Sequence, residues 1–157
     1  NQLRGHIGDG IVLDLFSGIG TMGLEAASRG AKEVVLVEQD RKIFAMLEEN
    51  IATLDCKDIA IALQSDALSS VPLLRVQRPV DVIFIDPPYA MMVDVVTRER
   101  IFDQVRTFNT ILDPEGLVVL RTPIDPRLTD HTIDNLVGPE VHKMGPGMWV
   151  LFYGMAT

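Results

Sequence analysis

Short apolar runs alternate with segments of helical periodicity along most of this chain, and this alternation limits the possible folds more than any other feature. Parallel strands cannot be joined by a tight turn, so strands separated by helices predict an α/β protein with a mostly parallel sheet. Helices are expected at 21–29, 40–54 and 94–112, where apolar residues recur on one face. Five runs are predicted to be buried strands: 11–16, 34–37, 59–63, 80–85 and 117–120.

The C-terminal segment follows a different pattern. Residues 141–144 and 148–153 flank Gly145-Pro146-Gly147, which predicts a β-hairpin and hence one antiparallel strand. Trp149 alternates with apolar neighbours there and is expected in the core. The chain has 157 residues and no internal repeat or low-complexity linker, so we expect a single domain over 1–157.

Composition narrows the classes of function. The net charge of −8 has the wrong sign for a protein that grips phosphate backbones over its whole surface. We therefore expect any nucleic-acid contact to be local, or the basic element to lie outside this sequence, which starts at Asn1 rather than Met. The single cysteine, Cys56, excludes an internal disulfide framework and is typical of a reducing cytoplasm. No apolar run is long enough to cross a bilayer, and the histidines are too widely separated in sequence to indicate a metal site.

A glycine-rich motif follows the first predicted strand. Gly18, Gly20 and Gly23 match G-x-G-x-x-G, in which glycine lets the backbone turn tightly and approach a ligand. Alone, this match is as typical of a simple strand-to-helix turn. Glu38, which ends the second predicted strand, is placed to accept hydrogen bonds from ribose hydroxyls. The negative charge of Asp14 before the loop suits a cationic sulfonium better than a pyrophosphate, so the motif favours S-adenosylmethionine over NAD.

Two further sets of residues keep more than one interpretation. Asp66 follows the third predicted strand, where its carboxylate could accept from an adenine amino group or cap the next helix. Arg98, Arg100 and Arg106 could form a basic rim that contacts RNA, although a solvated helix face is the commoner meaning of such spacing.

The sharpest signal is Asp86-Pro87-Pro88-Tyr89, directly after the fourth predicted strand. The prolines stiffen the backbone, but a rigid turn requires neither the acid before them nor the aromatic ring after them. An exocyclic amine on a nucleic-acid base is a poor nucleophile because its lone pair is delocalised into the ring. Asp86 and the Pro87 carbonyl can each accept one N–H and stabilise the charge that develops on nitrogen, while Tyr89 can stack on an extruded base. The motif therefore predicts methyl transfer to such an amine.

Together these segments resemble the RsmD-type family, bacterial methyltransferases that act on guanine N2 of small-subunit ribosomal RNA. The resemblance implies a Rossmann-like class I methyltransferase fold, with a mostly parallel seven-stranded sheet of order 3-2-1-4-5-7-6. Helices on both faces and an antiparallel strand in a C-terminal hairpin complete that fold. Members normally begin with a basic arm; nothing before Ile11 matches it, so we expect the arm to be missing from this sequence. The matching segments are 13–20, 23–26, 28–31, 37–38 and 84–89.

The resemblance implies methyl transfer from S-adenosylmethionine to guanine N2, with ribosomal RNA or the small ribosomal subunit as partner. Nothing in the sequence requires a dimer, a metal or a membrane, so we expect a cytoplasmic monomer. A DNA adenine-N6 or cytosine-N4 methyltransferase and an inactive cofactor-binding module remain alternatives. The expected catalytic residues are Asp86, Pro87, Pro88 and Tyr89. The expected cofactor contacts are Asp14, Phe16, Gly18, Gly20, Gly23, Glu38, Gln39, Asp66, Ala67 and Asp86.

Overall fold

The structure, a computed structural model, describes residues 3–156. Residues 1, 2 and 157 lie outside the described part, and the described residues do not test the expectation of a missing N-terminal arm. The strands are β1 (Ile11–Leu15), β2 (Glu33–Glu38), β3 (Ala60–Gln64), β4 (Val80–Ile85), β5 (Leu112–Thr122), β6 (Leu136–Gly145) and β7 (Met148–Met155).

These strands form one seven-stranded sheet in the order β3-β2-β1-β4-β5-β7-β6. Strands β1 to β5 pair in parallel, and β7 is antiparallel to both of its neighbours, β5 and β6. The predicted α/β class, the strand order and the antiparallel C-terminal hairpin are confirmed. Because β1 to β4 are parallel, their carboxyl ends meet at one edge of the sheet, and both sequence motifs follow strands that end there.

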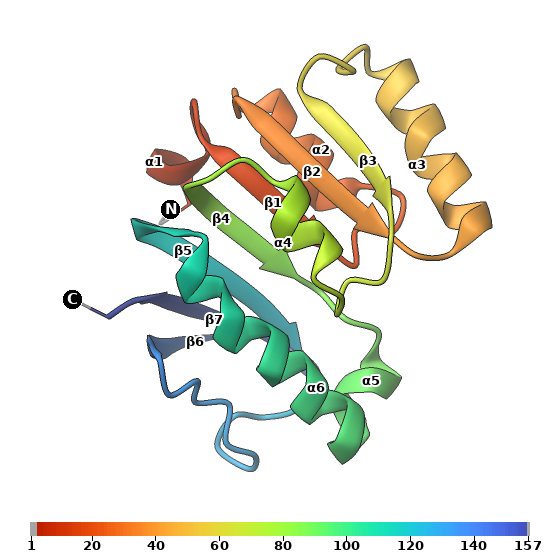
Figure 1. Ribbon diagram of the computed structural model, residues 1–157. Coiled ribbons are helices and arrows are strands. Elements are labelled where there is room, and N and C mark those ends of the chain that lie inside the picture. Colours follow the sequence, from red (N-terminus) through yellow and green to blue (C-terminus); the bar gives the residue numbers. More distant parts are fainter. Residues whose placement is uncertain (1–2, 157) are drawn as a thin grey trace.

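Helices cover both faces of the sheet. In Figure 1, α4 and α6 lie in front of the strands and α2 lies behind them. Among the described residues, no helix combines the length and the apolar character needed to span a bilayer. The helices are α1 (Arg4–Ile7), α2 (Thr21–Ser28), α3 (Arg41–Thr53), α4 (Val71–Arg75), α5 (Tyr89–Val93) and α6 (Val95–Arg106), with a 3-10 turn at Thr107–Thr110.

The core consists of two apolar layers, one on each face of the sheet. Successive side chains of a strand point to opposite faces, so Val12 of β1 and Val82 of β4 pack with α2 and α3. The next residues in each strand, Leu13 and Ile83, pack on the other face with α6. All four of these side chains have no solvent exposure, which explains why the central strands are almost continuously apolar in sequence.

The predicted helix over 94–112 is wrong at its C-terminal end. Helix α6 stops at Arg106, and Leu112 begins β5 instead of lying on the buried side of the helix. Pro114 excludes a helix that continues past this point, because the residue before a proline is driven to extended backbone, but the chain has already left α6 through the 3-10 turn at Thr107–Thr110. The helical spacing of Phe108 and Leu112 hid this break from a reading of apolar periodicity.

Two apolar residues are less buried than the sequence predicts. Leu54 follows the last turn of α3 rather than lying on its packed face, and its side chain is 60% exposed. Trp149 of β7 packs only partly against the core, and its ring has the Lys143 ammonium 5.8 Å from its centroid. The C-terminal hairpin is longer than expected, since β6 starts at Leu136 rather than at 141.

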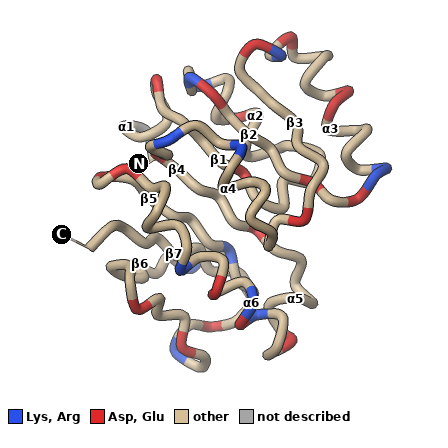
Figure 2. The backbone as a smooth tube through the Cα atoms, viewed as in Figure 1, with Lys and Arg blue, Asp and Glu red and all other residues tan. Residues whose placement is uncertain are grey.

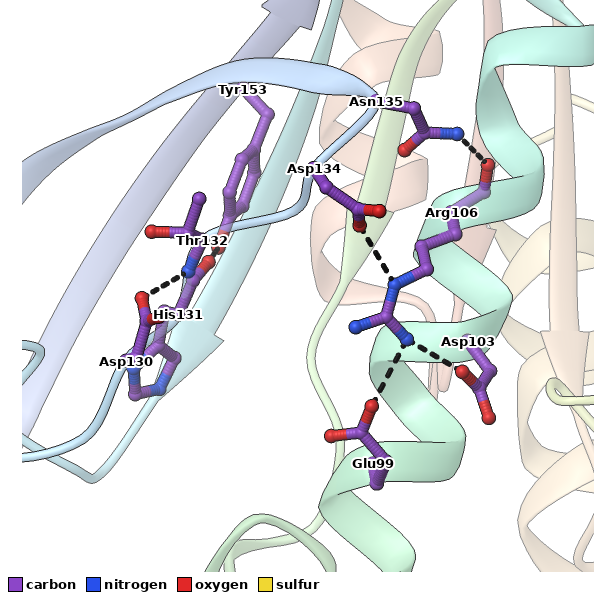
Figure 3. Close-up of polar contacts among 9 residues, drawn as sticks. All are labelled: Glu99, Asp103, Arg106, Asp130, His131, Thr132, Asp134, Asn135 and Tyr153. Carbon is purple, nitrogen blue, oxygen red and sulfur yellow. Dashed lines mark hydrogen bonds and ion pairs between the residues drawn. The ribbon is translucent and has the colours of Figure 1, made fainter.

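The connection between β5 and β6 is fastened to the sheet by polar groups (Figure 3). The Tyr153 hydroxyl donates to the His131 carbonyl at 2.6 Å, and the His131 ring lies 3.1 Å from the Thr122 hydroxyl on β5. Burial lowers the pKa of His131, so the ring is held neutral among these partners. This anchoring fixes the segment that follows the C-terminal end of β5.

Candidate active site

The glycine loop between β1 and α2 has the backbone of a ligand-binding turn. Three of its residues have positive φ: Phe16 at 59°, Gly18 at 58° and Gly20 at 98°. A positive φ is uncommon for a bulky residue such as Phe16, and strain of this kind clusters at functional sites. The loop is pinned to β2, because the Ser17 amide donates to the Val37 carbonyl at 2.9 Å.

Gly20 and Gly23 of the motif pack against leucine side chains in the core. A Cβ on Gly20 would lie 2.6 Å from Leu47 Cδ1 of α3, and one on Gly23 would lie 2.5 Å from Leu36 Cδ2 of β2. Neither glycine lines the cavity described below. The missing Cβ lets Leu47 of α3 pack against Gly20 and Leu36 of β2 pack against Gly23 in α2.

Glu38 ends β2 and joins the loop to the start of α3. Its Oε1 accepts from the Gly18 amide at 3.0 Å, and its Oε2 accepts from the Asp40 amide at 2.8 Å. Each carboxylate oxygen carries a second lone pair, so both can still accept a hydroxyl proton. The geometry therefore suits the predicted contact of Glu38 with ribose.

Asp14 lies beneath the loop rather than in it. Its side chain is 1% exposed, and its Oδ2 accepts from the Gly23 amide at 3.0 Å. Burial, together with the smaller effect of the nearby Asp86 charge, raises the pKa of Asp14 to about 7 against the lowering effect of that hydrogen bond. The contact of Asp14 with a cofactor stays a prediction.

The Asp86–Tyr89 motif leaves the sheet directly after β4. Burial raises the pKa of Asp86, although the guanidinium of Arg121, with Nη1 3.1 Å from Asp86 Oδ2, opposes that rise. Pro88 caps α5 with an extended backbone, and its carbonyl accepts from the Met91 amide at 3.0 Å. Tyr89, the first residue of α5, keeps 55% of its surface exposed, so its ring is available to stack on a partner.

The two motifs line one cavity of about 660 Å³ at the carboxyl edge of the sheet. All four expected catalytic residues, 86–89, are among the lining residues. Six of the expected cofactor residues also line it: Phe16, Gly18, Glu38, Gln39, Ala67 and Asp86. The other four, Asp14, Gly20, Gly23 and Asp66, do not.

Asp66 stabilises the turn after β3. Its Oδ1 accepts from the Leu68 amide at 2.9 Å, whereas α4 begins only at Val71, after Ser70. The interpretation of Asp66 as a helix cap is therefore wrong. Its contact with an adenine ring stays a prediction, supported by the presence of its neighbours Ser65 and Ala67 in the cavity wall.

Several residues of the site were missed by sequence reasoning. Ile43 of α3 and Met91 of α5 add apolar wall, and Asp40 caps α3 by accepting from the Ile43 amide at 3.0 Å. Arg121 was missed as well, although a signal for it existed. Like Asp86, it follows directly after an apolar strand run, which places it at the same edge of the sheet.

Two of the three arginines considered as a basic rim, Arg98 and Arg106, bind groups of the protein itself, whereas Arg100 is exposed. Arg106 is bound by three acids, Glu99 at 3.1 Å, Asp103 at 2.6 Å and Asp134 at 3.1 Å (Figure 3). Arg98 donates to the Met92 carbonyl at 2.9 Å and so holds α5 against α6. Figure 2 shows Lys and Arg scattered among Asp and Glu rather than gathered over one region. Within residues 3–156, no three His, Cys, Asp or Glu side chains come together as a metal site.

Comparison with known proteins agrees with this geometry. Residues 1–152 match the sequence model of the family described as conserved hypothetical protein 95. The chain belongs to this family. The conserved hypothetical protein 95 family is that of the RsmD-type proteins, so the resemblance found in the sequence is confirmed.

Two curated relatives give the scale of the sequence similarity. The ribosomal RNA small subunit methyltransferase D of Haemophilus influenzae is 36% identical over 90 residues, which are 57% of this chain and 47% of the relative. Its namesake from Escherichia coli is 38% identical over 89 residues, 57% of this chain and 43% of the relative. The chain thus spans less than half the length of these curated relatives.

Structural similarity extends over more of the molecule. A solved structure from Escherichia coli, described as "Putative methyltransferase yhhF", superposes with a TM-score of 0.76 and 28% identity. That match covers 99% of this chain and 81% of the other. Together with the strand order, it shows that this member of the conserved hypothetical protein 95 family has the class I methyltransferase fold.

Proposed function

We propose that this chain is a single methyltransferase domain, residues 1–157, which transfers a methyl group from S-adenosylmethionine to the exocyclic N2 of a guanine in small-subunit ribosomal RNA. One observation carries the proposal: the glycine loop with Glu38 and the Asp86–Tyr89 motif line the same cavity. The glycine loop and Glu38 form the cofactor half of this cavity, and the Asp86–Tyr89 motif forms the acceptor half. Direct transfer of a methyl group from a bound cofactor to a bound base requires both halves within one cavity.

The cofactor half has the chemistry that S-adenosylmethionine needs. Glu38 offers acceptors for ribose hydroxyls, and Phe16 and Ile43 supply apolar surface for a flat ring. Asp86 in the wall provides negative charge for a cation. When bound, S-adenosylmethionine supplies an electrophilic methyl group on a sulfonium. Gly18, Gln39 and Ala67 are proposed as further contacts, with Asp14, Gly20, Gly23 and Asp66 acting on the cofactor from behind the wall.

The acceptor half acts on the amine of the base. The Asp86 carboxylate and the Pro87 carbonyl each accept one N–H, which aims the nitrogen lone pair and stabilises the positive charge that develops there. Pro87 and Pro88 hold these acceptors in a stiff backbone segment, and the exposed Tyr89 ring stacks on the extruded base. Methyl transfer makes the proton on nitrogen acidic, so it can pass to the Asp86 carboxylate or to water and a strong general base is unnecessary.

The substrate class is supported by the relatives, which are named for methylation of small-subunit ribosomal RNA. The net charge of −8 and the pairing of Arg106 with acids favour a local RNA contact over a broad one. We further propose that the protein is a monomer that acts in the cytoplasm on ribosomal RNA or the small subunit and needs no metal.

Three measurements test the proposal. Isothermal calorimetry should show binding of S-adenosylmethionine and no comparable binding of NAD. The protein should then transfer tritium from labelled S-adenosylmethionine to 16S ribosomal RNA or to small subunits isolated from cells that lack the protein. Mass spectrometry of the digested nucleosides should give N2-methylguanosine. Transfer to a DNA adenine or cytosine instead, or cofactor binding without transfer to any nucleic acid, would overturn it.

A further inference from the structure

Arg121 is brought to the Asp86 carboxylate by the register of two parallel strands. Ile85 at the end of β4 pairs with Leu120 of β5, so the next residues along, Asp86 and Arg121, lie side by side. Arg121 Nη1 is 3.1 Å from Asp86 Oδ2. The two side chains are 36% and 31% exposed, so the pair is partly withdrawn from water and less screened than a surface pair.

Among the charged groups described near this pair, Arg121 is the one that favours an ionised Asp86. From β1, Asp14 is close enough for its charge and that of Asp86 to disfavour each other. Arg121 also lines a second cavity, of about 570 Å³, with Glu140 and His142 of β6, and these two residues bind each other at 2.9 Å. Partial burial pushes Asp86 toward its protonated form, and the guanidinium of Arg121 opposes this through its charge and its hydrogen bond.

We infer that Arg121 is a positioning residue for the proposed methyl transfer: by binding Asp86 Oδ2 it keeps the carboxylate ionised and leaves Oδ1 to accept the N–H of the base. The inference rests on the proposed function of Asp86. A protonated Asp86 would present a donor to an amine that already carries protons, and the negative charge that stabilises the developing cation would be lost. Arg121 itself touches neither the base nor the methyl group in this role.

The test compares Arg121→Gln, which removes the charge, with Arg121→Lys, which keeps it. Arg127→Gln is the matched control, because Arg127 forms its ion pair with Asp125 on the connection after β5, away from the cavity. The first readout is the pH titration of the Asp86 carboxyl carbon by NMR in each folded variant, which requires no turnover. The second is the pH profile of kcat for RNA methylation, with KM for RNA and the affinity for S-adenosylmethionine measured alongside.

In Arg121→Gln the Asp86 pKa should rise by about one unit, as expected for the loss of an adjacent opposite charge. The acidic limb of the kcat profile should move by the same amount, so that kcat below that limb falls about tenfold. Arg121→Lys should restore most of both values, and Arg127→Gln should match the wild type.

An unchanged Asp86 titration in Arg121→Gln would overturn the inference, whatever the protein methylates. A rise in KM for RNA with an unshifted kcat profile would also overturn it, because Arg121 would then bind the substrate instead. A wild-type protein that transfers no methyl group would count against the proposed function alone, since the carboxyl titration still decides what Arg121 does to Asp86. If Arg121→Gln fails to fold, Arg121→Met takes its place in the titration, since it keeps an unbranched side chain but removes the charge and should raise the Asp86 pKa by the same amount.

Discussion

Replacement of Asp14 by asparagine should change how the stability of this protein depends on pH. Burial raises the pKa of Asp14 from 3.8 to about 7. Between these two pH values an unfolded chain has Asp14 ionised while the folded protein has it protonated, so folding takes up a proton. The contribution of Asp14 to folding stability is therefore fully present below pH 3.8, falls as pH rises through this window, and levels off above about pH 7.

The size of the effect follows from the shift. Each pKa unit corresponds to about 1.4 kcal/mol, so a shift of about 3 units removes at most about 4 kcal/mol of folding free energy between acidic and neutral pH. Asparagine has nearly the same shape and keeps an oxygen that can accept the Gly23 amide, but it cannot ionise. Asp14→Asn should therefore match the wild type near pH 4 and exceed its stability progressively toward pH 8.

Urea unfolding followed by circular dichroism at half-unit pH steps measures this difference. Asp113→Asn is the control for loss of one carboxylate, because Asp113 accepts the Glu115 amide from a more accessible position. A difference between Asp14→Asn and wild type that stays constant from pH 4.5 to 8, within roughly 0.5 kcal/mol, would refute the reasoning. The site would then tolerate a charged Asp14 at no cost, and its burial would say nothing about the field under the glycine loop.

Three further predictions concern the same cavity. Gly20→Ala should destabilise the protein by about 2–4 kcal/mol, because φ is 98° there and a Cβ would lie 2.6 Å from Leu47 Cδ1; an unchanged urea midpoint would contradict the described loop. Asp86→Ala should lower methyl transfer at least about 100-fold while calorimetry shows S-adenosylmethionine affinity within a few-fold, and unchanged transfer would remove Asp86 from the mechanism. Tyr89→Phe should keep most of the kcat/KM for RNA and Tyr89→Ala should lose about 10- to 100-fold, whereas equal loss in both variants would argue against stacking.

The sequence predicted the fold because its signals are local. The sequence runs of β1 and β4 are continuously apolar, which predicts strands buried on both faces. In the structure Val12 and Val82 lie on one face of the sheet, and Leu13 and Ile83 lie on the other. The glycine loop and the Asp-Pro-Pro-Tyr segment were likewise predictable, because each depends on residue types that only a particular backbone or chemistry requires. Their shared cavity follows from the parallel sheet, whose strands end at one edge.

What the sequence did not predict depends on contacts between distant segments. The Asp86–Arg121 pair needs the register of β4 against β5, which no local pattern specifies. The burial of Asp14 depends on how α2 closes over β1 at Gly23. The early end of α6 was missed for a different reason, since Phe108 and Leu112 keep the helical spacing of apolar residues although the helix has already ended at Arg106.

The most direct test of the account is a crystal structure with S-adenosylhomocysteine and an RNA fragment that carries the target guanosine. The account predicts that the exocyclic N2 lies about 3 Å from the Asp86 carboxylate and the Pro87 carbonyl, with the cofactor sulfur in line behind it and the Tyr89 ring against the base. A base bound elsewhere, or with the Asp86 carboxylate turned away from its amine, would contradict it.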